Sequence, residues 1–151
     1  MAKPVNIFFS YAHKDEKLMN AVRQQLIIFE RRGDIAKHYD RQIPPGTQWQ
    51  GAIDNFLFKS QVILLFISPD FIESRYCYDV EVTTALERHE SGEARVIPII
   101  LRPCAWQDAP FGQLEVLPAD GKPVTSWRNR DAVCLSIAQE IMNVVSELQA
   151  A

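Results

Sequence analysis

The fold of this chain is decided by a stretch near its N-terminus, Val5-Asn6-Ile7-Phe8-Phe9-Ser10-Tyr11-Ala12-His13-Lys14-Asp15-Glu16. Its first five residues are largely apolar, and such a run is typical of a strand that is buried on both faces of a parallel sheet. The strand ends at Ser10-Tyr11, and the charged residues that follow open a helix. Ligands of open parallel sheets bind at the carboxyl ends of the strands. Ser10, Tyr11 and His13 are therefore candidate site residues.

Strand-like segments recur along the whole chain. Val62–Ile67 is apolar at every position, which indicates the central strand. Pro98 lacks a ladder donor and places its strand toward an edge of the sheet. The predicted strands are Val5–Phe9, Ala36–Tyr39, Val62–Ile67, Val96–Leu101 and Val124–Trp127.

Helix-like segments separate these strands. One carries Leu18, Val22, Leu26 and Phe29 at helical spacing, with Gly33 as its stop. The next begins at a Thr47 cap, the third runs from about Arg75 to Glu90, and the last carries an apolar stripe. The stripe of the last helix contains Ile137, Ile141, Val144, Val145 and Leu148. The alternation predicts an α/β fold, a doubly wound parallel sheet with helices on both faces.

Length and composition predict one domain over residues 1–151, either a whole protein or one module of a larger one. The net charge of −3 gives no basic surface for nucleic acid. No signal peptide is visible and no apolar run is long enough to span a bilayer, so we expect a cytoplasmic protein without a membrane partner. Cys77, Cys104 and Cys134 fit neither a disulfide framework nor a zinc site, and we expect no bound metal.

The sequence lacks the motifs of Rossmann dinucleotide-binding proteins, P-loop proteins, serine hydrolases and phospho-receivers. The chain contains no dinucleotide fingerprint, no P-loop, no G-x-S-x-G elbow and no paired acids directly after the first strand. The remaining candidate is Tyr76-Cys77-Tyr78-Asp79-Val80-Glu81, which opens the helix after the central strand. On a helix Asp79 and Glu81 point in directions about 200° apart, so only one of them faces a cleft.

Three segments of the chain occur in the order found in Toll/interleukin-1 receptor (TIR) domains. They are Phe8-Phe9-Ser10-Tyr11 with Asp15 (box one), the proline-rich Arg41–Gly46 loop (the BB loop), and Tyr76-Cys77 with Glu81 (the aromatic-Cys-acid helix). The resemblance spans Val5 to about Leu148 and is closest in character to bacterial TIR domains. It implies a flavodoxin-like TIR fold whose five-stranded parallel sheet has the order 2-1-3-4-5.

The resemblance also implies an enzyme. Many TIR domains cleave NAD⁺ at the nicotinamide-ribose bond and form ADP-ribose or a cyclised variant, with NAD⁺ as substrate and no separate cofactor. The family uses one glutamate on the aromatic-Cys helix. Its usual spacing falls here on Val80, and we assign the role to Glu81 because the apolar Val82 follows it. Asp79 is the competing assignment.

One carboxylate suffices for this chemistry because nicotinamide leaves as a neutral molecule. The barrier lies in the oxocarbenium-like sugar, which a carboxylate stabilises by its charge and by hydrogen bonds to ribose hydroxyls. Aromatic rings would wall the cleft, Ser10 would bind ribose or phosphate, and Arg41 would bind the pyrophosphate. The predicted substrate-binding residues are Phe9, Ser10, Tyr11, His13, Arg41, Ile43, Trp49, Tyr76, Cys77 and Asp79.

The resemblance further implies self-association through TIR–TIR contacts that include the Arg41–Gly46 loop. Such a domain serves as the effector of a bacterial immune (antiphage) or cell-death system, triggered by a fused or partner sensor. The alternative is a TIR interaction module that assembles without turnover. A third hypothesis is a flavodoxin-like nucleotide sensor that binds NAD⁺ without chemistry.

Overall fold

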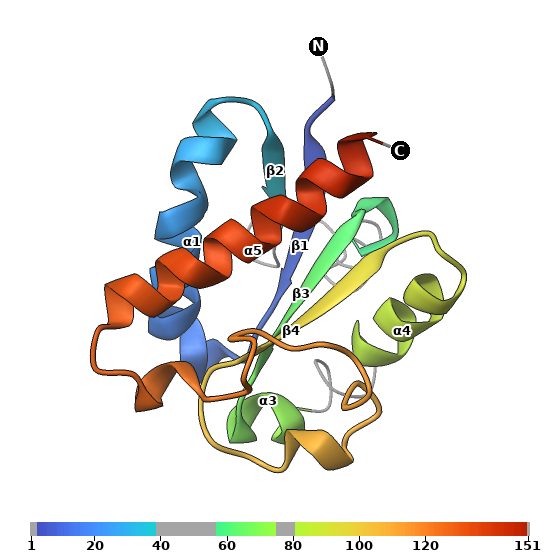
Figure 1. The fold of residues 1–151 in the computed structure, drawn as a ribbon. Helices are drawn as coiled ribbons and strands as arrows, with labels where there is room; N and C mark the ends of the chain where they lie inside the picture. The colour runs from blue at the N-terminus through green and yellow to red at the C-terminus, as the bar shows by residue number, and fades with distance from the viewer. Residues whose placement is uncertain (1–2, 39–56, 75–80, 151) are drawn as a thin grey trace, which may run out of the picture.

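The computed structural model describes residues 3–38, 57–74 and 81–150, in which a parallel sheet carries helices on both faces (Figure 1). The strand order is β2-β1-β3-β4, and every pair is parallel. The strands are β1 (Val5–Ser10), β2 (Ile35–His38), β3 (Val62–Ile67) and β4 (Arg95–Ile100). The first four predicted strands are thus confirmed to within one residue at each end.

The helices lie between and after these strands. They are α1 (Glu16–Arg31), α3 (Pro69–Glu73), α4 (Val82–Glu90) and α5 (Arg130–Ala150), with 3-10 turns η1 (His13–Asp15), η4 (Trp106–Asp108) and η5 (Val124–Ser126). The predicted helix around Trp49 and the first turns of the Arg75–Glu90 helix lie outside the described residues. Within the part of the chain that the structure describes, no helix has the length and hydropathy needed to cross a membrane.

The predicted fifth strand at Val124–Trp127 is wrong. Val124–Ser126 forms the 3-10 turn η5 after Pro123, and the Trp127 N–H donates back to the Val124 carbonyl at 3.2 Å. Val124 is fully buried. Its β-branched side chain therefore serves as an anchor for a turn, a role that a three-residue apolar pattern does not distinguish from a strand.

Leu117 contacts the sheet where a fifth strand would lie. It makes an isolated parallel bridge with Ile99. Its N–H donates to the Pro98 carbonyl at 2.9 Å, and its carbonyl accepts from the Ile100 N–H at 2.8 Å. The N–H and C=O of a strand residue point to the same side, so the missing donor of Pro98 faces away from β3 and costs no β3–β4 hydrogen bond. The predicted edge position of Pro98 is confirmed.

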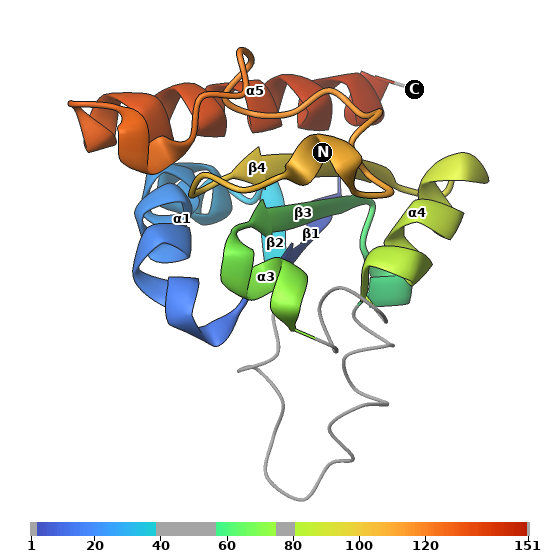
Figure 2. The same cartoon turned by 90° about the horizontal axis from the view of Figure 1, so that it is seen from below.

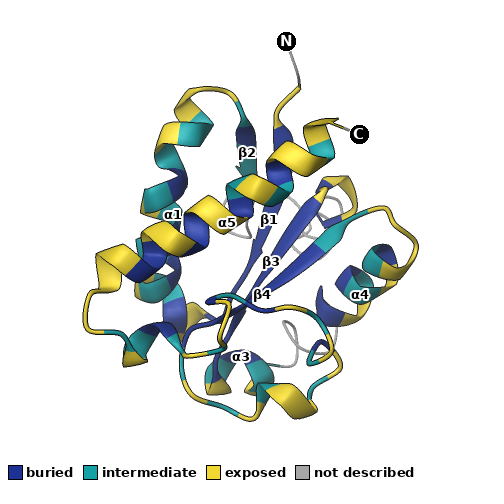
Figure 3. Ribbon diagram, viewed as in Figure 1, coloured by how far each residue is buried: buried dark blue, intermediate teal, exposed yellow. Residues whose placement is uncertain are grey.

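Two apolar clusters sandwich the sheet, because alternate side chains of a strand point to opposite faces. Val62, Leu64 and Phe66 of β3 pack with α1 and α5, whereas Ile63, Leu65 and Ile67 pack with α3 and α4. Figure 2 shows α5 and α3 on opposite sides of the sheet. In Figure 3 the central strands are buried throughout.

The connection from α1 to β2 is fixed by the predicted glycine stop. Gly33 adopts φ +84°, in the left-handed region that favours glycine. Its N–H donates to the Glu30 carbonyl at 3.0 Å, and the Asp34 N–H donates to the Phe29 carbonyl at 3.0 Å. This pair of bonds is a Schellman motif, and it turns the chain directly into β2.

Leu64→Ala is expected to lower the free energy of unfolding by about 2–5 kcal/mol, because Leu64 is fully buried in the central strand and its removal leaves a cavity. Urea unfolding measures the change. Leu135→Ala on α5, where the side chain is 43% exposed, is the matched control and should shift stability by about 0.5 kcal/mol or less. Equal losses in the two variants would contradict the two-cluster description.

His38 predicts a pH dependence of stability. Its Nε2 lies 3.1 Å from Oδ1 of Asn6, and burial together with the charge of Lys59 lowers the pKa of His38. The unfolded chain then binds a proton more readily than the folded one below a pH of about 6.5. The free energy of unfolding therefore decreases as the pH is lowered through that range. We expect His38→Gln to flatten the dependence of the unfolding free energy between pH values of about 7 and about 5. A slope identical to that of wild type would show that His38 does not contribute.

Candidate functional site

Two predicted site residues meet at the carboxyl edge of the sheet. Ser10 is the last residue of β1, and Glu81 directly precedes α4. The Ser10 hydroxyl donates a hydrogen bond of 2.9 Å to Oε1 of Glu81. Both side chains are buried, with Ser10 1% and Glu81 4% exposed. The topology therefore places a carboxylate against a hydroxyl from a segment that is 71 residues away in sequence.

Packing and a buried arginine hold the helix that follows Glu81. Val82 and Ala85 belong to the apolar cluster on the α3/α4 face of the sheet. Arg88, 7% exposed, donates from Nη1 to the carbonyls of Leu57 and Ser60, the latter at 2.5 Å. Burial lowers the pKa of Arg88, and the nearby Glu93 partly opposes this. These contacts tie α4 to the segment that leads into β3.

The other described site residues divide between core and surface. Phe9 and Tyr11 belong to the apolar cluster beneath α1 and α5, and the Phe9 ring stacks on Phe66 with centroids 5.8 Å apart. Both side chains are under 10% exposed, so the structure gives their rings a packing role. His13 lies exposed in η1 at the start of the helix.

The remaining predicted residues lie outside the described residues. They are Arg41, Ile43, Trp49, Tyr76, Cys77 and Asp79. Their roles stay predictions, as does the choice of Glu81 over Asp79. Of the other two cysteines, Cys134 is buried and Cys104 is half-buried, and burial raises the pKa of both thiols.

A second polar cluster, which sequence reasoning missed, lies at the same edge. Arg102 donates from Nε to Oδ1 of Asp15 at 2.9 Å and from Nη2 to Oδ2 of Asp70. The Ser68 hydroxyl donates to Oδ2 of Asp15. We call Asp15, Ser68, Asp70 and Arg102 the Arg102 cluster. Each of these residues follows the carboxyl end of a predicted strand, which indicates this edge, but no local pattern predicts that they pair with one another.

The short helix α3, which contributes Asp70, was also missed. Its five residues, Pro69–Glu73, are too few to show helical periodicity. The local sequence nevertheless encodes it: Ser68 caps the helix by accepting from the Phe71 N–H at 3.0 Å, and Pro69 occupies the first turn. Serine followed by proline at this place is a helix start.

Asp15 and Glu81, two buried carboxylates at this edge, accept hydrogen bonds from different donors. Asp15 is 2% exposed and accepts hydrogen bonds from the cationic Arg102 and from Ser68. Burial lowers the pKa of Arg102, but its hydrogen bonds to Asp70 and Asp15 and their charges outweigh this and raise it overall. Asp15 is thus engaged in a structural ion pair, whereas Glu81 accepts from the neutral hydroxyl of Ser10.

Within residues 3–38, 57–74 and 81–150, no group of three histidine, cysteine or carboxylate side chains is arranged to hold an ion. The chemistry that the described site offers is that of a buried carboxylate and a hydroxyl.

Comparison with known proteins gives the chain its family. A model of the TIR domain family matches residues 7–133. The uncharacterized protein y4lF of Sinorhizobium fredii is 48% identical over 136 residues, which cover 90% of this chain. The chain spans only 42% of the length of that relative.

Solved structures share the fold. The TIR domain of the Toll-related receptor TRR-2 from Hydra magnipapillata is similar with a TM-score of 0.56 and 24% identity, over 74% of this chain and 81% of that one. The TIR domains of the activated Roq1 resistosome, which directly recognizes the pathogen effector XopQ, give a TM-score of 0.51 and 19% identity over 90% and 71% of the two chains. The four parallel strands, the carboxyl-edge site and the match over residues 7–133 agree, and this chain belongs to the TIR domain family.

Proposed function

We propose that this TIR domain cleaves NAD⁺ between nicotinamide and ribose, with Glu81 as the essential carboxylate. The hydrogen bond between Ser10 and Glu81 is the observation that carries the proposal. It joins box one to the acidic helix at the edge where parallel sheets bind ligands. The Glu81 carboxylate is held in place by a donor rather than neutralised by it.

Cleavage of the nicotinamide-ribose bond requires one negative charge close to the ribose. The bond between ribose C1′ and the nicotinamide nitrogen breaks, and its electron pair leaves with the neutral nicotinamide. Glu81 stabilises the resulting oxocarbenium-like sugar, and water then adds to C1′ and loses a proton to give ADP-ribose. A carboxylate has lone pairs for several donors, so Glu81 can accept ribose hydroxyls while Ser10 remains bonded.

Activity is proposed to depend on assembly. Glu81 is only 4% exposed, so its surroundings must move before a ribose reaches it. Self-association through the Arg41–Gly46 loop would supply that movement. The relative y4lF is more than twice as long as this chain, which leaves room for a sensor domain. We propose that the domain acts as an effector in bacterial immunity or cell death.

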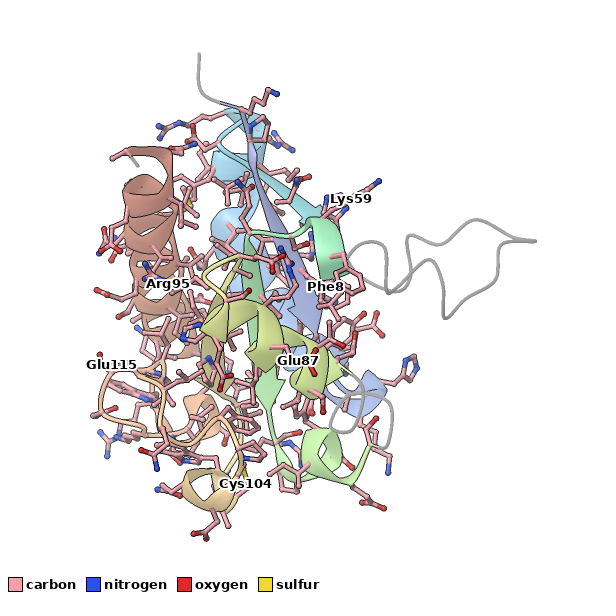
Figure 4. All side chains as sticks on the ribbon, turned by 90° about the vertical axis from the view of Figure 1, so that its right-hand side faces the viewer. Phe8, Lys59, Glu87, Arg95, Cys104 and Glu115 are labelled. Carbon is pink, nitrogen blue, oxygen red and sulfur yellow. The ribbon has the colours of Figure 1, made fainter. Side chains whose placement is uncertain are left out.

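Glu81→Gln is expected to lower nicotinamide release from NAD⁺ by at least about 100-fold, because the charge that stabilises the sugar cation is lost while the side-chain shape is kept. Release is measured by liquid chromatography on concentrated protein, with and without a crowding agent. Glu87→Gln is the matched control, since Glu87 is an exposed glutamate on the same helix, labelled in Figure 4. Loss of activity in Asp79→Asn but not in Glu81→Gln would move the essential carboxylate to Asp79. No release by wild type, with assembly intact by light scattering, would favour an interaction module.

Ser10→Ala is expected to reduce kcat by between about 10- and 100-fold, since the hydrogen bond that orients Glu81 has a charged acceptor and is worth about 1.5–3 kcal/mol. The reduction should appear at saturating NAD⁺, which separates orientation of the carboxylate from substrate binding. An increase in KM with unchanged kcat would instead assign Ser10 to the substrate.

A further inference from the structure

The Arg102 cluster joins segments that follow three different strands. Asp15 ends η1 after β1, Ser68 and Asp70 follow β3, and Arg102 follows β4. The Asp15 side chain is almost fully buried, while those of Arg102 and Asp70 are 32% and 25% exposed. One guanidinium thus bridges two carboxylates from separate loops, a geometry that its planar fork allows and a lysine cannot reproduce.

This cluster flanks both members of the Ser10–Glu81 pair. On one side, only Tyr11–Lys14 separate Ser10 from Asp15, and the Asp15 N–H donates to the Ala12 carbonyl at 2.9 Å. On the other side, α3 ends eight residues before Glu81. Both members of the pair therefore lie within eight residues in sequence of a segment that the Arg102 cluster holds.

An apolar connection transmits the position of α3 to Glu81. Phe71 of α3 is fully buried and belongs to the same cluster as Ala12, from the loop after Ser10, and Val82, the residue after Glu81. Close-packed interiors transmit small shifts instead of absorbing them. The ion pair at Asp70 and the packing of Phe71 thus both hold the same short helix.

We propose that Arg102 is a positioning residue for the proposed NAD⁺-cleaving site. By holding Asp15 and Asp70 at one spacing, it sets the approach of the Ser10 hydroxyl to the Glu81 carboxylate. This role rests on the proposed function. Nε and Nη2 of Arg102 donate to carboxylates of the protein, and the KM of the variants distinguishes positioning from substrate binding.

The local fold has other supports, so loss of Arg102 should be survivable. Ser68 caps α3, and the Ile72 N–H donates to the Ser68 carbonyl at 3.1 Å. The Leu101 N–H donates to the Ile67 carbonyl at 2.9 Å and keeps the chain before Arg102 on the sheet. In Arg102→Gln, the amide group can still donate to Asp15, which limits the effect of leaving a buried carboxylate.

The test compares Arg102→Gln, Arg102→Lys and Asp70→Asn in nicotinamide release. We expect Arg102→Gln to lower kcat by between about 10- and 100-fold with KM within about threefold of wild type, because misplacing a catalytic group acts on the chemical step. Arg102→Lys should recover part of the loss, and Asp70→Asn should lose less than Arg102→Gln. Asp70 is part-exposed, so Asp70→Asn should disturb folding less than Arg102→Gln does. It therefore still tests the proposal if Arg102→Gln folds poorly.

Arg95→Gln is the matched control. Arg95 begins the same strand that precedes Arg102, but it pairs with Glu147 of α5 at 3.3 Å. In Figure 4 Cys104, which lies two residues beyond Arg102, is near the bottom of the molecule, well below Arg95. This variant should retain the wild-type kcat. Equal kcat values in Arg102→Gln and Arg95→Gln, or a loss fully explained by the unfolded fraction, would overturn the proposal.

Hydrogen exchange separates this proposal from the proposed function. In Arg102→Gln the amides of η1, of α3 and of Val82 should exchange faster than in Arg95→Gln. The amides of α5 should exchange in Arg102→Gln as they do in the wild type. An inactive wild type would refute NAD⁺ cleavage, yet the exchange pattern would still report on positioning. Unchanged protection of η1, α3 and Val82 would overturn the role of Arg102 whatever the activity.

Discussion

Complete burial of β3 is the constraint on which the rest of the structure depends. All six of its side chains are fully buried, so both faces of the sheet must be covered by helices. Parallel strands require crossover connections, and every loop that leaves a strand at its carboxyl end then emerges at one edge. Ser10, Ser68 and Arg102 come together at that edge as a consequence of connectivity.

Side-chain hydrogen bonds join the segments that meet at this edge. Ser10 bonds Glu81, Ser68 bonds Asp15, and Arg102 bonds both Asp15 and Asp70. Such partnerships add little net stability, since burial of each group offsets most of the gain. Their effect is on geometry, because a buried polar side chain has only one arrangement that leaves it paired. These pairings therefore fix how the segments that follow β1, β3 and β4 lie relative to one another.

Sequence patterns predicted most of the sheet and less of the edge. Continuous apolar runs identified β1, β3 and β4, and Pro98 placed β4 at an edge, because burial on two faces leaves an unambiguous signature. Periodicity could not separate a strand from a turn at Val124, nor reveal a five-residue helix at Pro69–Glu73. For the site, Ser10 and Glu81 were singled out beforehand. Arg102 was not, because its partners lie 87 and 32 residues away and an isolated arginine carries no local pattern.

Pro98 has a consequence for how copies of this chain can associate. Growth of a sheet by addition of a further strand needs alternate donors and acceptors along the open edge. On β4 the donor at position 98 is missing, and the Pro98 carbonyl and the Ile100 N–H are already bonded to Leu117. The outer side of β4 is thereby closed to templated polymerisation of the amyloid type. Assembly of this domain can proceed through helices and loops without the hazard of uncontrolled strand exchange at this edge.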